Sequence, residues 1–154
     1  MIQSLGQSLF SWIHDWFKPL AYSIILLREQ GIPCVFYGDY FGIPSEKVSA
    51  KNEILDKLLL LRKDYAYGDQ HDYFDHNDVV GWTREGDQGH SESGMAVLMT
   101  DKDSGEKQMY VGKHFANMTF YDFLGHVEEK VIIDENGNGL FKVNGGSVSV
   151  WVKE

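Results

Sequence analysis

Residues 95–100 read Met95-Ala96-Val97-Leu98-Met99-Thr100, and the turn signal Asp103-Ser104-Gly105 follows at once. The same alternation of short apolar or β-branched runs with turn residues continues through the part of the chain after Tyr67. Eight such runs occur there: 72–76, 79–83, 95–100, 108–112, 119–123, 130–133, 140–143 and 147–152. Short strands at this spacing are typical of an antiparallel sandwich or barrel.

The chain before Tyr67 has a different composition. All three prolines lie within the first 44 residues, whereas 12 of the 16 glycines lie from Gly68 onward. Apolar residues there recur at spacings of three and four, as an amphipathic helix requires, and Gly31 is placed to end that helix. The residues on this face are Leu9, Ile13, Trp16, Leu20, Ile24 and Leu27.

Two further elements are expected before residue 67. Residues 33–37 form a continuous apolar run between Pro33 and Gly38, the pattern of a strand buried on both faces of a parallel sheet. A second amphipathic helix runs to about Lys63 and carries Ile54, Leu55, Leu58, Leu59 and Leu61. The sequence therefore predicts an α+β composite: helix, strand and helix in residues 1–66, and an antiparallel β-domain in residues 67–154.

Composition limits the classes of function. The formal net charge of −9 over 154 residues argues against a nucleic-acid partner and is compatible with neutral sugars or calcium. Cys34 is the only cysteine, and its place in an apolar run predicts a buried, inert thiol. Residues 1–17 lack the basic start of a leader, and the apolar run 21–27 is too short to span a bilayer. A cytoplasmic protein without a membrane partner is expected.

Five longer sequence motifs occur in a recognisable order. They are WFKPLAY at 16–22, GIPCVFYGD at 31–39, YAYGDQHDYFDH at 65–76, VGWTREGD at 80–87 and VNGGSV at 143–148. Together they resemble the C-terminal portion of bacterial liquefying and cytoplasmic-type α-amylases, of glycoside hydrolase family 13. The resemblance implies that residues 1–66 are a (β/α)₈-barrel remnant (seventh helix, eighth strand, eighth helix) and that residues 67–154 are a Greek-key β-sandwich.

The resemblance also implies a chemistry. Family enzymes hydrolyse internal α-1,4-glucosidic bonds of starch with an Asp nucleophile, a Glu acid/base and a second Asp; in retaining enzymes the two carboxyl groups that attack and protonate lie about 5 Å apart. The positions of the nucleophile and the acid would precede residue 1, and the family's His-Asp pair falls on Met1 and Ile2. No catalytic residue is therefore expected in this chain, and α-glucan is the partner of the intact enzyme.

Other site residues follow from the same resemblance. A calcium ion between barrel and third domain would use Asn77, Asp78 and Asp101, which supply only part of the 6–8 oxygens that calcium takes, so binding is expected to be weak. Asp39 follows the expected eighth strand, where it either shapes a substrate subsite or ends the strand in a turn. His71 and His76 fit polar strand positions beside a turn better than metal ligands. Five aromatics are expected in the core rather than against sugar rings: Trp82, Tyr110, Phe120, Tyr121 and Trp151.

Three interpretations of the whole chain stay open. It is a non-catalytic part of an α-amylase, a free-standing carbohydrate- or partner-binding β-module, or one half of a split amylase. In each case the expected strand at 33–37 has no second strand in residues 1–66 to accept its backbone hydrogen bonds. Homo-oligomerisation of this exposed barrel remnant, with Val35 and Phe36 paired between two copies, is one way to satisfy these hydrogen bonds.

Overall fold

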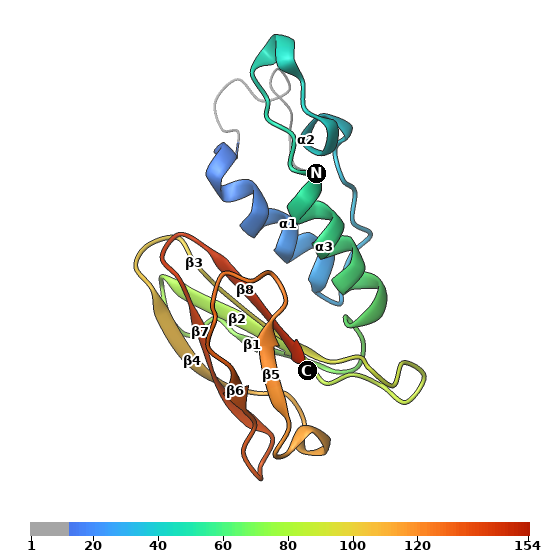
Figure 1. The fold of residues 1–154 in the computed structure, drawn as a ribbon, viewed down its shortest axis with the longest axis vertical. Coiled ribbons are helices and arrows are strands. Elements are labelled where there is room, and N and C mark those ends of the chain that lie inside the picture. The colour runs from blue at the N-terminus through green and yellow to red at the C-terminus, as the bar shows by residue number, and fades with distance from the viewer. Residues whose placement is uncertain (1–12) are drawn as a thin grey trace.

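The computed structural model describes residues 13–154, and Figure 1 shows their fold. Two sequence-based expectations fall outside these residues. They are the helical position of Leu9 and the assignment of Met1 and Ile2 to the family's His-Asp pair.

The helices lie in the first part of the chain, except the short η3 Lys113–Phe115. Their bounds are η1 Asp15–Phe17, α1 Lys18–Leu27, α2 Tyr37–Phe41, η2 Pro44–Glu46 and α3 Asn52–Asp64. Pro19 stands in the first turn of α1, where its missing N–H removes no helical hydrogen bond. The helix ends at Leu27 because Arg28 is already extended, so the prediction that Gly31 ends it is wrong by one turn. The second predicted helix is confirmed as α3.

The predicted strand at 33–37 is not formed. Residues 32–36 belong to no strand, and Tyr37 begins α2 instead. The run is not buried on both faces either, because Tyr37 is 71% exposed and Cys34 is exposed. The exposure of Cys34 also corrects the prediction of a buried cysteine. The physical reason is that a strand needs a partner for its N–H and C=O groups, and no strand of residues 13–154 lies beside this segment.

All eight strand-like runs after Tyr67 are confirmed as strands. They are β1 Gln70–Tyr73, β2 Val79–Arg84, β3 Met95–Thr100, β4 Gly105–Tyr110, β5 Thr119–Asp122, β6 Val131–Ile132, β7 Asn138–Val143 and β8 Val148–Lys153. Every pairing between them is antiparallel. Six form one sheet in the order β1-β2-β3-β8-β5-β6, and β4 pairs with β7 in a second sheet. Strands β1 and β4 begin two and three residues earlier than predicted.

The larger sheet is covered on both faces (Figure 1). Its central strand β3 is buried at all six residues, and successive side chains enter different clusters. Met95, Val97 and Met99 belong to a cluster shared with α1 and α3. Ala96 and Leu98 belong to a second cluster shared with β4 and β7. The helices, the larger sheet and the smaller sheet therefore form three layers.

A tight junction brings the helices onto the sheet. The Gly94 and Gly86 amides donate to the carbonyls of Tyr65 and Tyr67, at 3.0 and 2.9 Å. Gly68 has φ +80°, and a Cβ there would lie 2.0 Å from the Gly86 carbonyl oxygen, so only glycine fits. This junction lies between the C-terminal end of α3 and the start of β1, whose first residue, Gln70, pairs with Arg84 at the end of β2.

We predict that Leu58→Ala destabilises the helices and the sheet together. Leu58 is fully buried in the shared cluster, so its truncation should cost about 2–5 kcal/mol. The matched control is Leu60→Ala, two residues along the same helix and 43% exposed, which should change stability by less than about 0.5 kcal/mol. Urea unfolding should be followed by far-UV dichroism and tryptophan fluorescence. Two separate midpoints in Leu58→Ala, with the sheet unaffected, would contradict a shared core.

Candidate functional site

Asp39 lies in the first turn of α2 and is only 2% exposed. Its Oδ1 atom is 2.5 Å from the Lys18 Nζ atom, and the Tyr22 hydroxyl donates to its Oδ2 atom at 2.7 Å. Both partners belong to α1, so the carboxylate fastens α2 to the first helix. The backbone N–H of Lys51 also bonds the Asp39 carbonyl, at 2.8 Å.

This buried cluster is electrostatically satisfied within the chain. Burial, followed by the hydrogen bond to Asp39, raises the pKa of Tyr22 well above its usual range, so the phenol stays a hydrogen-bond donor. A buried carboxylate that already holds an ammonium and a phenol is a structural anchor. Its role as a substrate contact stays a prediction.

The three residues suggested for calcium come together at one end of the larger sheet. Asn77 and Asp78 lie in the bend before β2, and Asp101 lies in the bend after β3. Because Val79 pairs with Thr100, the two bends are neighbours. The sequence separation of 23 residues between Asp78 and Asp101 is thus closed by the antiparallel register.

These residues do not complete a calcium shell. Calcium takes 6–8 oxygen ligands, whereas residues 13–154 contain no group of three or more His, Cys, Asp or Glu side chains placed to hold a metal ion. The Asp78 carboxylate is moreover paired with the Lys102 ammonium at 2.7 Å, and a cation would have to displace it. Weak calcium binding by Asn77, Asp78 and Asp101 stays a prediction.

The histidines and aromatics serve the β-domain. The ring of His71 lies 2.5 Å from a Glu85 oxygen, and His76 Nδ1 accepts from two backbone N–H groups at 3.1 Å, as a turn residue does. Trp82, Phe120 and Trp151 are fully buried, which confirms their assignment to the core. The two predicted core tyrosines, Tyr110 and Tyr121, are half-buried.

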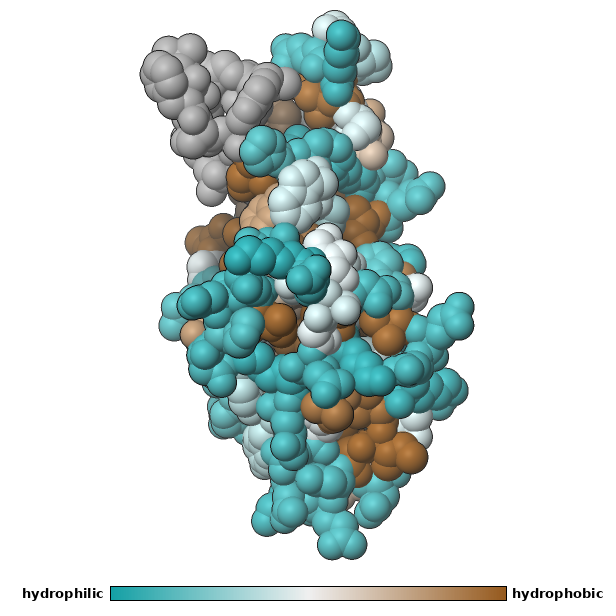
Figure 2. Space-filling view, turned by 90° about the vertical axis from the view of Figure 1, so that its left-hand side faces the viewer, coloured by the Kyte–Doolittle hydropathy of each residue, from teal (hydrophilic) through white to brown (hydrophobic). Residues whose placement is uncertain are grey.

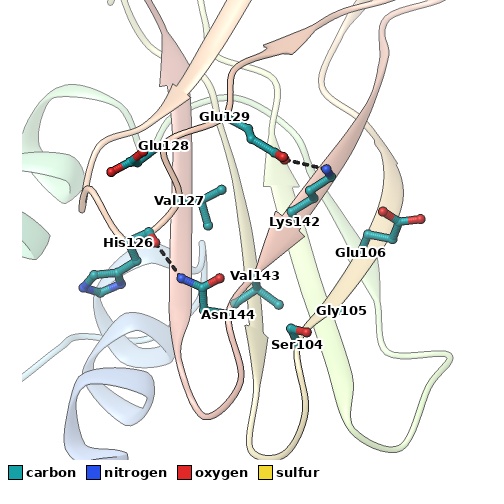
Figure 3. A pocket seen from close by; sticks show the side chains of 10 residues that line it. All are labelled: Ser104, Gly105, Glu106, His126, Val127, Glu128, Glu129, Lys142, Val143 and Asn144. Carbon is teal, nitrogen blue, oxygen red and sulfur yellow. Dashed lines mark hydrogen bonds and ion pairs between the residues drawn. The ribbon is translucent and has the colours of Figure 1, made fainter.

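A polar cavity of about 600 Å³ lies where the loop 126–129 passes the start of β4 and the end of β7 (Figure 3). Asn144 Nδ2 donates to the His126 carbonyl at 2.6 Å, and Lys142 pairs with Glu129. The lining residues are Ser104, Gly105, Glu106, His126, Val127, Glu128, Glu129, Lys142, Val143 and Asn144. They offer hydrogen-bonding groups and no Phe, Tyr or Trp ring. The Asn144-Gly145-Gly146 turn is visible in the sequence, but the loop that meets it is distant along the chain.

Comparison with known proteins identifies relatives. Residues 95–152 match the family described as Alpha-amylase C-terminal. An α-amylase of Geobacillus stearothermophilus is 56% identical over 147 residues, which are 96% of this chain and 27% of that protein. A cytoplasmic α-amylase of Escherichia coli is 43% identical over 158 residues, again 96% of this chain, and 32% of that protein. The chain therefore spans about a third or less of the length of these relatives.

A solved structure shows the same fold. The α-amylase of Malbranchea cinnamomea superposes with a TM-score of 0.67 at 11% identity, over 90% of this chain and 33% of that one. At this identity the likeness concerns the fold alone. It supports the arrangement of helices and antiparallel sheets described above.

We predict that Tyr22→Phe costs about 1–3 kcal/mol at neutral pH, because a buried carboxylate loses a donor. The folded pKa of Tyr22 lies above its unfolded value of about 10, so the stability that its neutral form contributes is present below pH 10 and is lost as the pH rises through the folded pKa. The slope of stability against pH above 10 should thus be shallower in Tyr22→Phe. Tyr37→Phe, at a 71% exposed position, is the control. Equal slopes in all three proteins would refute the coupling.

Proposed function

The chain corresponds to the C-terminal part of a bacterial α-amylase, and we propose that its two segments have the roles that this family gives them. Residues 1–66 would be the last elements of a (β/α)₈ barrel, and residues 67–154 the closing Greek-key β-domain. The sheet order favours a Greek key, since the last strand, β8, returns to lie between β3 and β5.

One observation supports the barrel assignment most directly. Residues 32–36 belong to no strand and are extended at Phe36, and several large apolar side chains of the helical part lie open to solvent. Trp16 is 52% exposed, Ile32 99%, Tyr37 71% and Phe41 61%. Figure 2 shows hydrophobic surface on this helical part of the molecule. A strand between two parallel neighbours, roofed by helices, would cover these groups.

The proposed activity is shared with a further segment of chain. The catalytic carboxylates of the family would come from barrel strands that precede this region, so residues 1–154 would not hydrolyse starch by themselves. Joined to those strands, they would help cleave internal α-1,4 bonds of an α-glucan. In that assembly Asp39 would stand near the substrate end of the barrel, and Asn77, Asp78 and Asp101 would meet further calcium ligands; alone, they would bind calcium weakly.

The location and the oligomeric state are proposed on similar grounds. No helix within residues 13–154 is long and apolar enough to cross a membrane. The relative in E. coli is named a cytoplasmic α-amylase, and a cytoplasmic place is proposed here by analogy. Without barrel strands, the edge at Val35 and Phe36 would be open to pairing between two copies of the chain.

We predict that activity appears only by complementation. Residues 1–154 and the matching N-terminal part of the G. stearothermophilus relative should each release no reducing sugar from soluble starch, whereas the two co-expressed should. Cys34→Asp, at an exposed position of this chain, should leave its folding intact and abolish activity, because a charge would enter the barrel sheet. Cys34→Ser is the matched control and should remain active.

Other outcomes separate the alternatives. Starch hydrolysis by residues 1–154 alone would contradict the proposal. Saturable binding of maltoheptaose by this chain, without activity in the co-expressed pair, would favour a free-standing carbohydrate-binding module. Light scattering at several concentrations shows whether Cys34→Asp also breaks self-association.

A further inference from the structure

All three arginines of the sequence line one cavity. Arg28 follows the end of α1, Arg62 lies in the last turn of α3, and Arg84 ends β2. They meet with Lys63 around a hollow of about 380 Å³. The remaining lining residues are Glu29, Leu59, Ala66 and Tyr67. The lining thus has four basic side chains and one acidic side chain, although the whole chain has a formal net charge of −9.

Arg84 is the most telling member. It is 7% exposed, and its Nε atom donates to the Gly68 carbonyl at 3.0 Å. No carboxylate of residues 13–154 lies within 4.0 Å of its guanidinium, although Glu29, Asp69 and Asp87 act on it from farther away. Burial lowers the pKa of Arg84, and repulsion by Arg62 adds to the effect. A mostly buried guanidinium with no carboxylate in contact has room for a closer anionic partner on the side that faces the hollow.

Of the other two arginines, one bonds a neutral carbonyl and one pairs with a carboxylate. Arg62 donates to the Leu26 carbonyl at 2.6 Å, a neutral acceptor at the end of α1. Arg28 pairs with Asp72 at 2.8 Å and lies over the Phe74 ring, 4.9 Å from its centre. Of the three, only Arg28 thus has a carboxylate partner within the described part of the chain.

We propose that this cavity binds the phosphate group of a small molecule. Guanidinium groups offer paired N–H donors that match two oxygens of a phosphate, and guanidinium groups from α1, α3 and β2 can face a tetrahedral dianion from different sides. The volume leaves room beside the phosphate for a group the size of one sugar ring. The phosphate could come from inorganic phosphate or from a phosphorylated sugar, which present the same dianion.

The site stands apart from the proposed substrate end. Lys18, which holds Asp39, and Arg28 mark opposite ends of α1, about 15 Å apart at 1.5 Å per residue. A ligand here would touch both helices, the junction and β2, and would therefore fasten the helical layer to the larger sheet. Binding to the folded chain alone raises its stability by mass action. All residues that line this cavity belong to the described part of this chain.

Calorimetric titration and thermal unfolding test the proposal. The chain is titrated with sodium phosphate and with glucose 6-phosphate, and with sodium chloride at matched ionic strength and pH. Saturable binding at one site and a midpoint that rises with phosphate but not with chloride are expected. Arg62→Gln should weaken binding at least tenfold, and Arg62→Lys less. Lys113→Gln, an exposed lysine on η3, should leave it unchanged.

Arg84 is buried and donates to the Gly68 carbonyl, so a substitution there can destabilise the fold. Binding is therefore compared only among variants that unfold cooperatively. Tighter binding of glucose 6-phosphate than of phosphate would assign the site to a sugar phosphate, and equal binding would assign it to free phosphate. Three results would overturn the proposal: no saturable binding, an equal effect of chloride, or an unchanged affinity in Arg62→Gln.

Discussion

The burial of one face of the larger sheet beneath α1 and α3 is the interaction on which the other features depend. Trp82, Val97 and Val150 face this layer, and Leu26 and Leu58 meet them from the helices. Neither layer would keep its apolar surface from water alone, and each buried side chain of this size contributes about 1.5–3 kcal/mol. The same packing sets the positions of the two helix ends. One end of α1 carries the Asp39 anchor, and the other end meets the three arginines.

The elements were predictable to different degrees for physical reasons. Strands after Tyr67 show the period of two and the turn residues that local sequence dictates, so all eight were found. The segment at 33–37 has an equally clear pattern, yet it forms no strand, because pairing depends on neighbours and not on local preference. Its apolar character is better explained by contacts with barrel strands, as proposed above. Cys34 was predicted to be buried because that strand was expected to be covered on both faces, and it is exposed because the strand does not form.

Sites were harder to predict than elements. Asp39 was found through the family resemblance, but its partners Lys18 and Tyr22 lie 21 and 17 residues away and only the packing of α2 on α1 joins them. The arginine cavity was not predictable from the sequence, because Arg28, Arg62 and Arg84 come from three separate elements. The available signal was compositional: three arginines among 14 basic residues. Their spacing along the chain does not indicate that they lie around one cavity.

Amide hydrogen exchange of residues 1–154 tests the shared core most directly. If the helices and the sheet form one cooperative layer system, the amides of 22–27 and 55–61 should exchange with the same opening free energy as those of β3 and β8, while those at 32, 34 and 35 exchange fast. Helical amides that open several kcal/mol more easily than the sheet would contradict the account. Protected amides at 32, 34 and 35 would contradict the absence of a strand in this segment.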